Sequence, residues 1–114
     1  MKDNRSQSRI KDFWEQGSPM KLIGENFSYE EKRKFRYSLQ DYMHSTFKFD
    51  NFVGKLVLDV GCGAGIDSAE FARNGTSVVS ADFTRTATQS TQNLLREANL
   101  PAQVVQADAT SLPF

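Results

Sequence analysis

The amino-acid sequence predicts an α/β domain built on a parallel sheet and preceded by a helical extension. Three short segments rich in β-branched residues alternate with helical segments, and the links between them are short. In addition, a turn with three glycines follows the first of these segments. We expect residues 1–52 to form the extension and residues 53–114 to form the sheet-containing domain.

The extension is expected to contain a helix that begins at Ser28. The stretch "SYEE" is typical of a capping box, in which the Ser28 hydroxyl accepts a hydrogen bond from the Glu31 amide and the Glu31 carboxylate reaches back. Apolar residues then recur at helical spacing, which predicts one apolar stripe that packs in the core or against another element. This stripe comprises Phe35, Leu39, Tyr42, Met43 and Phe47.

The first strand is predicted at "LVLDV", residues 56–60, because the segment is short, apolar and β-branched. After the glycine turn, "IDSAEFARNG" predicts a compact helix that Asn74 and Gly75 close. The stretch "TSVVSAD", residues 76–82, predicts the second strand.

A longer helix is predicted next, capped by Thr84 and ended by Pro101. The third strand is predicted at "AQVVQAD", residues 102–108. Because the strands are predicted to be parallel, their carboxyl ends meet at one edge of the sheet, where ligands bind in folds of this kind. Each of the three ends carries an aspartate, namely Asp59, Asp82 and Asp108.

The glycine turn does not fit two known phosphate-binding patterns. In the G-x-G-x-x-G pattern the third glycine is missing, because Gly65 comes one residue early, and no Lys-Ser or Lys-Thr pair follows for the other loop. Asp59, two residues before Gly61, would repel bound phosphates but attract an ammonium or a sulfonium group. The turn therefore predicts a ligand that carries positive charge.

The other two aspartates indicate a nucleoside. Asp82 can accept hydrogen bonds from both ribose hydroxyls. Asp108 can accept from an exocyclic amine while the Ala109 amide donates to a ring nitrogen, and Phe83 can lie along the ring face. Together these positions predict an adenosine with a cationic, amino-acid-like tail.

The stretch "VLDVGCGAGIDSAEFARNG…VVSADFT…QADATSLPF" resembles the class I S-adenosylmethionine-dependent methyltransferases, in particular the small-molecule branch with a D-x-G-x-G-x-G loop. The resemblance covers residues 53–114, which would be the N-terminal half of the cofactor-binding domain. It implies the first three strands of a seven-stranded, Rossmann-like sheet, so the chain is expected to be truncated. We expect the isolated chain to be inactive, to bind cofactor weakly or not at all, and to self-associate through an unpaired sheet edge.

The resemblance implies that Asp59 and the loop backbone hold the methionyl amino group, that Asp82 holds the ribose, and that Asp108 and Ala109 hold the adenine. Arg36 of the extension would pair with the methionyl carboxylate, in a lid with Trp14 and Tyr37. The residues expected to bind S-adenosyl-L-methionine are Arg36, Asp59, Gly61, Cys62, Gly63, Gly65, Asp82, Phe83, Asp108 and Ala109.

The composition of the sequence limits the classes of partner that the chain is expected to bind. Fourteen basic and fourteen acidic residues give zero formal charge, so neither nucleic acid nor an anionic membrane surface is favoured. The resemblance to the small-molecule branch implies that the methyl acceptor is a small molecule. No apolar run approaches the ~20 residues of a membrane span, and a cytoplasmic protein is expected. Cys62 lacks a neighbouring base and is expected to fill space, while a single histidine and a single cysteine predict no metal site.

Two further classes of function remain open at this point. One is a non-catalytic module that binds S-adenosylmethionine or only a partner chain. The other is a nicotinamide-dependent oxidoreductase, against which the early Asp59 and the misplaced third glycine argue.

Overall fold

The computed structural model describes residues 27–101 and 103–110, and the structural statements below concern these residues. Three strands form a parallel sheet in the order β1-β2-β3: β1 (Leu56–Val60), β2 (Ser77–Asp82) and β3 (Gln103–Gln106). The predicted α/β class is confirmed, and so is the presence of three strands. The third strand is shorter than predicted, because it ends at Gln106 and Asp108 lies in the turn that follows. Trp14 lies outside the described residues, as does Ala102 at the predicted start of the third strand.

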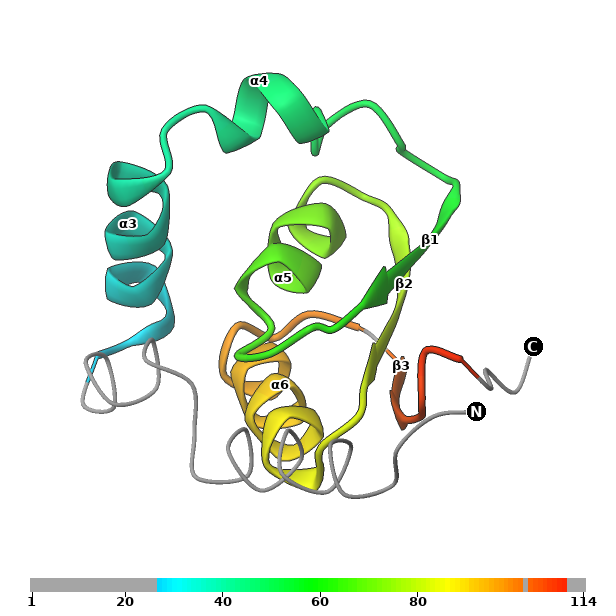
Figure 1. Ribbon diagram of the computed structural model, residues 1–114. Coiled ribbons are helices and arrows are strands. Elements are labelled where there is room, and N and C mark those ends of the chain that lie inside the picture. Colours follow the sequence, from blue (N-terminus) through cyan, green and yellow to red (C-terminus); the bar gives the residue numbers. More distant parts are fainter. Residues whose placement is uncertain (1–26, 102, 111–114) are drawn as a thin grey trace.

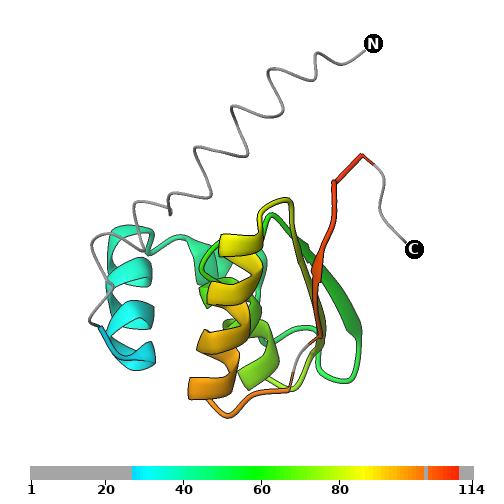
Figure 2. The same cartoon turned by 90° about the horizontal axis from the view of Figure 1, so that it is seen from below.

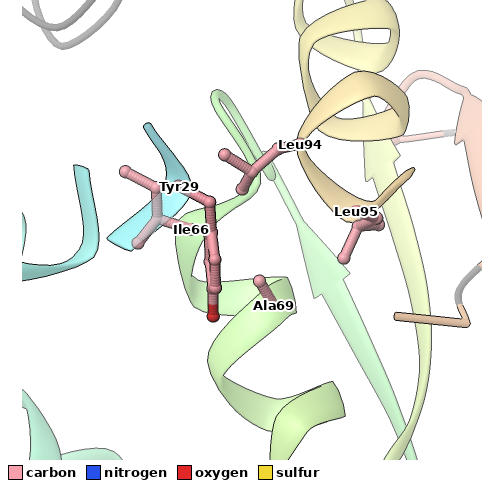
Figure 3. Close-up of a cluster of buried hydrophobic side chains, with 5 residues drawn as sticks. All are labelled: Tyr29, Ile66, Ala69, Leu94 and Leu95. Atoms are coloured by element: carbon pink, nitrogen blue, oxygen red, sulfur yellow. The ribbon is translucent and has the colours of Figure 1, made fainter. Parts of the chain in front are cut away.

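Two helices connect the strands and cover one face of the sheet (Figure 1). They are α5 (Ile66–Arg73) and α6 (Arg85–Glu97). Seen from below, α3 (Tyr29–Leu39) lies on the far side of this helix pair from the strands (Figure 2). A buried cluster joins the three helices and contains Tyr29, Ile66, Ala69, Leu94 and Leu95 (Figure 3).

The helix boundaries follow the capping signals of the sequence. Ser28 Oγ accepts a hydrogen bond from the Glu31 amide at 3.2 Å, and the Glu31 carboxylate accepts one from the Ser28 amide, which confirms the capping box. Thr84 Oγ1 likewise caps α6 by accepting from the Ala87 amide at 3.1 Å. Gly75, with φ +88°, follows the end of α5 as expected for a helix that ends in the left-handed conformation.

The apolar stripe predicted for the extension is wrong. The chain breaks after α3 and resumes as the short helix α4 (Met43–Phe47), so Met43 is buried while Leu39, Tyr42 and Phe47 are 66%, 55% and 47% exposed. Instead, α3 docks on α5 mainly through Tyr29 and two arginines. The partners of these arginines lie more than thirty residues away in the sequence, so periodicity within the extension gave no sign of them.

The register places polar side chains on the helix-covered face of the sheet. Asp59 is paired with Ser80, and Asp82 is paired with Gln106. Since side chains alternate along a strand, Asp59, Ser80 and Asp82 share one face. On the opposite face Leu56, Leu58 and Val60 are 72%, 39% and 46% exposed.

Within the described ranges, no helix is both long and apolar enough to cross a membrane.

Candidate functional site at the carboxyl edge of the sheet

The three predicted aspartates all lie toward the carboxyl edge of the parallel sheet. Asp59 is the penultimate residue of β1, Asp82 is the last residue of β2, and Asp108 comes two residues after β3. The glycine loop, residues 61–65, connects β1 to α5 at this edge. The topology therefore places Asp59 and Asp108 at the same edge of the sheet, although they are almost fifty positions apart in the sequence.

The glycine loop is held to the end of β2 by backbone hydrogen bonds. The Gly61 and Cys62 amides both donate to the Ala81 carbonyl, at 2.8 and 3.1 Å, and the Gly65 amide donates to the Cys62 carbonyl at 2.9 Å. Gly61, Gly63 and Gly65 have φ values of +75°, +57° and +87°. These are left-handed conformations that residues with a side chain adopt only at a cost, which explains the three glycines.

The glycines differ in what lies beside them. A Cβ atom added to Gly61 or Gly63 would meet nothing within 4 Å, so both border open space. A Cβ atom on Gly65 would lie 2.9 Å from the Thr91 Cα atom of α6. Gly61 and Gly63 thus leave room for a ligand against the backbone, whereas Gly65 allows α6 to pack closely on the loop.

Asp82 fastens the loop to the second βα turn. Its Oδ2 atom accepts a hydrogen bond from the Gly63 amide at 3.0 Å, and its Oδ1 atom accepts from the Thr84 amide at 3.0 Å and from the Thr84 hydroxyl at 3.3 Å. A carboxylate offers about four lone-pair positions, so these three bonds leave capacity for one further donor, such as a hydroxyl group, on Oδ2. Hydrogen bonds from both ribose hydroxyls would require one of the Thr84 bonds to be given up. The side chain is half-buried at the edge of the sheet.

Asp59 lies deeper in the same region. Its Oδ2 atom accepts a 2.5 Å hydrogen bond from the Ser68 hydroxyl of α5. Burial raises the pKa of Asp59, and the charges of Asp67 and Asp82 raise it further, while the Ser68 hydrogen bond and the charge of Arg36 lower it. Several carboxylates therefore share this edge of the sheet, and a cationic ligand group would relieve their mutual repulsion.

The third aspartate lies in the turn that follows β3. Asp108 Oδ1 accepts from the amide and the hydroxyl of Thr110, at 2.8 and 2.7 Å. Ala109 is exposed in this turn, and Phe83 is half-buried after β2, where its carbonyl accepts from Gln106 Nε2 at 3.2 Å. Asp108, Ala109 and Phe83 thus follow adjacent strands of the sheet, as the adenine prediction requires.

Arg36 has a partner within the protein. Its guanidinium donates to both carboxylate oxygens of Asp67, at 2.8 and 2.6 Å, and the Tyr37 hydroxyl donates to Asp67 Oδ1 at 2.8 Å. Because Asp67 lies in the first turn of α5, directly after the glycine loop, these bonds fix α3 beside the site. The predicted pairing of Arg36 with a ligand carboxylate would require the guanidinium to be shared with Asp67.

Cys62 is buried in the loop, where its sulfur accepts a 3.2 Å hydrogen bond from the Thr91 hydroxyl. Burial raises the pKa of the Cys62 thiol to about 12. A thiol in this state is a poor nucleophile, which agrees with its predicted role as a space-filling residue.

The sequence did not point to several polar residues of α5, β2 and α6 that make contacts with Asp59, with the loop or with the extension. Each is a small or charged side chain that faces inward from a helix or strand where an apolar residue would be the norm. That position on the inward face was the available signal. The missed residues are Asp67, Ser68, Glu70, Ser80 and Thr91, of which Ser68, Glu70, Ser80 and Thr91 are buried.

The residues of this edge fit the cofactor expected from the sequence. Open space beside Gly61 and Gly63 allows close approach to the backbone, and the clustered carboxylates suit a cationic tail. Asp82 keeps acceptor capacity at the place where a ribose would lie.

Comparison with known proteins gives an independent result. The family model described as a methyltransferase domain matches residues 57–114, which is just over half of the 114-residue chain. The match begins in β1 and takes in the glycine loop and all three aspartates. No curated protein matches the chain.

One similar solved structure comes from work on the conversion of a disulfide bond into a thioacetal group during echinomycin biosynthesis. It is 30% identical, with a TM-score of 0.53, and the alignment covers 60% of this chain and 28% of that one. The [4+2]-cyclase SpnF is 26% identical, with a TM-score of 0.55 and coverage of 75% and 30%. An S-adenosylmethionine-dependent methyltransferase from Clostridium acetobutylicum shares the fold at 17% identity, with a TM-score of 0.51 and coverage of 94% and 39%.

The chain thus spans about a third of the length of these solved structures. Its three parallel strands and their helices correspond to a part of the larger α/β fold. With a family match that contains the glycine loop and the three aspartates, and with a shared fold, the chain belongs to the methyltransferase domain family, in the class I, Rossmann-like group.

Proposed function

We propose that this chain binds S-adenosyl-L-methionine at the carboxyl edge of its sheet, as the cofactor-binding part of a methyltransferase that acts on a small molecule. The observation that carries the proposal is the glycine loop, which borders open space at Gly61 and Gly63 and is braced by the Asp82 carboxylate. Asp59 and the loop backbone would hold the methionyl part. Asp82 would accept from the ribose, and Asp108 and Ala109 would contact the adenine beside Phe83.

The bound cofactor supplies an activated methyl group, so the residues of this chain are needed to orient it and to exclude water. A small-molecule acceptor is supported by the zero formal charge of the sequence, which offers no general attraction to nucleic acid. It is also supported by the similarity to the structure from work on echinomycin biosynthesis.

A second candidate is a module that binds the cofactor but performs no methyl transfer. The similarity to SpnF, described as a [4+2]-cyclase, favours keeping this candidate because one structure with this fold is described by a different chemistry. Turnover of small-molecule acceptors by the protein in its natural full length separates the two candidates: transfer of the methyl group supports the enzyme, and binding without transfer supports the module.

The binding proposal is tested by calorimetric titration of the full chain with S-adenosylhomocysteine, with NADH in a parallel titration. We expect a dissociation constant above ~1 µM, because only part of the fold is present, and no binding of NADH. Asp82→Ala should weaken the affinity at least tenfold, whereas Asp50→Ala, at an exposed position outside the site, should leave it unchanged. Absence of binding at millimolar ligand, or binding of NADH alone, would refute the proposal.

A further inference from the structure

A chain of hydroxyl groups leads from β2 through α5 to Asp59. Ser80 Oγ donates to Ser68 Oγ at 2.7 Å, and Ser68 Oγ donates to Asp59 Oδ2 at 2.5 Å. Both serines are fully buried, with 0% exposure. Since each hydroxyl carries one proton, the proton of Ser68 is directed to Asp59 and that of Ser80 to Ser68.

This arrangement lies within the first βαβ unit. Ser80 is the register partner of Asp59, so the two side chains lie on the same face of adjacent strands, and α5 places Ser68 to bridge them. An apolar residue at position 68 or 80 would pack on this face at no cost in desolvation. The chain of hydrogen bonds instead fixes the orientation of a carboxylate that has few other partners.

The two oxygens of the Asp59 carboxylate have different surroundings. Oδ2 accepts from Ser68, while Oδ1 accepts no hydrogen bond from any residue described in the structure. Among the described residues, every fully buried side-chain oxygen or nitrogen has a hydrogen-bond partner. Because Oδ1 has no such partner, it is not fully buried and has contact with solvent. The charged groups that act on Asp59 are Asp67 of α5, Asp82 of β2 and Arg36 of α3.

We propose that Ser68 and Ser80 are positioning residues for cofactor recognition, which hold Asp59 Oδ2 so that Oδ1 and the negative charge face the ammonium group of the ligand. The inference rests on the proposed cofactor role of Asp59 and deepens it. The hydrogen bond from Ser68 stabilises the charged form of the carboxylate against burial and against the charges of Asp67 and Asp82. Without it, Asp59 would take up a proton at a higher pH and lose its attraction for a cation.

The test is a pH titration of the Asp59 carboxyl carbon by NMR in the full chain and in three variants. The pKa of Asp59 should rise in Ser68→Ala and, to a smaller extent, in Ser80→Ala. It should be unchanged in Thr76→Val, which removes a buried hydroxyl that donates to the Phe52 carbonyl instead. Should Ser68→Ala fail to fold, the comparison of Ser80→Ala with Thr76→Val decides the question.

Affinity for S-adenosylhomocysteine is measured over the same pH range. At neutral pH we expect Ser68→Ala to bind about tenfold more weakly than the unmodified chain, with Ser80→Ala between them and Thr76→Val unchanged. The pH below which binding is lost should be highest for Ser68→Ala, intermediate for Ser80→Ala and unchanged for Thr76→Val.

The outcomes separate this inference from the proposed function. An Asp59 pKa that is unchanged in both serine variants overturns the inference, even where the cofactor product binds normally. If the pKa rises as expected but the unmodified chain does not bind S-adenosylhomocysteine at any pH, the proposed function fails and the role of the serines in recognition fails with it.

Discussion

Gly63 and Gly65 are two residues apart in one loop, and both have positive φ, but they face different surroundings. Gly63 borders open space, whereas Gly65 lies directly under the Thr91 backbone of α6. The same residue type therefore has two functions at this scale: one glycine leaves room for a ligand, and the other lets a helix pack closely.

Alanine substitutions should separate these two functions. Gly65→Ala combines a left-handed backbone with a contact too short to relieve by rotating a side chain, so we expect a loss of about 2–5 kcal/mol in the free energy of unfolding. Gly63→Ala should cost only ~1–2 kcal/mol but weaken binding of S-adenosylhomocysteine by filling the space beside the loop. Denaturant unfolding measures the loss of stability, and calorimetric titration measures the loss of affinity. Equal losses of stability would contradict this assignment.

At the scale of elements, α3 is attached to α5 by ion pairs rather than by an apolar stripe. Glu70 is 1% exposed, and its carboxylate accepts from Arg33 Nε at 2.9 Å and approaches His44 Nε2 at 2.6 Å. Burial alone would raise the pKa of Glu70, but the hydrogen bonds from Arg33 and His44 outweigh burial and lower it. The charge of this buried carboxylate therefore contributes to the interface, beside the Arg36–Asp67 ion pair and the packing of Tyr29.

Arg33→Ala should destabilise the chain by about 2–3 kcal/mol, because it removes the main partner of a buried charge while His44 and Arg73 remain nearby. Glu30→Ala removes only exposed pairs with Arg33 and Arg73 and should cost less than ~1 kcal/mol. Urea unfolding of the two variants measures the difference. A cost for Arg33→Ala as small as that for Glu30→Ala would show that the interface does not depend on this charge.

The same carboxylate predicts a pH dependence of stability. A carboxyl group whose pKa is lower in the folded than in the unfolded chain stabilises the fold above its unfolded pKa, and this contribution is lost as the pH falls through the folded pKa. Stability should therefore decline on acidification below about pH 4.5, the usual region for glutamate. Unfolding curves of Glu70→Gln should show a weaker decline over the same range; an identical decline would assign the effect to other groups.

Most of the fold was predictable from local sequence signals. The strands at 56–60 and 77–82 and the caps at Ser28 and Thr84 depend on residues within a few positions of each other. The docking of α3 was not predictable, because the partners of Arg33 and Arg36 lie on α5, and α4 and β1 separate α3 from α5 in the sequence. The position of the three aspartates at one edge of the sheet was predictable, because each lies at or near the end of a predicted strand. The contacts of Ser68 and Ser80 were not predictable, because they depend on how α5 packs against the sheet.

At the scale of the whole molecule, the sheet is covered unevenly. Helices α5 and α6 lie on one face, and on the other face Leu56, Leu58 and Val60 of β1 are exposed. Among the described strands, β1 pairs only with β2, so its other edge also has free backbone groups. Apolar side chains next to an open edge favour association between chains.

We therefore predict that the isolated chain self-associates through β1. Sedimentation velocity over a range of concentrations should show oligomers for the unmodified chain and a monomer for the double variant Leu56→Lys, Leu58→Lys, because lysine on an edge strand opposes pairing. Leu39→Lys, at an exposed position on α3, should associate like the unmodified chain. Association that is unaffected by the β1 variant but abolished by Leu39→Lys would move the interface to the extension.

The central claim is that one ligand lies along the carboxyl edge of the sheet, from the glycine loop to the turn after β3. The most direct test follows backbone amide NMR signals while S-adenosylhomocysteine is added to the full chain. We expect concerted shifts at Gly61, Gly63, Phe83 and Ala109, with little change in the surface hollow at the other end of α6, which includes Leu100 and Val104. Shifts confined to that hollow, or at only one of the three strand ends, would contradict it.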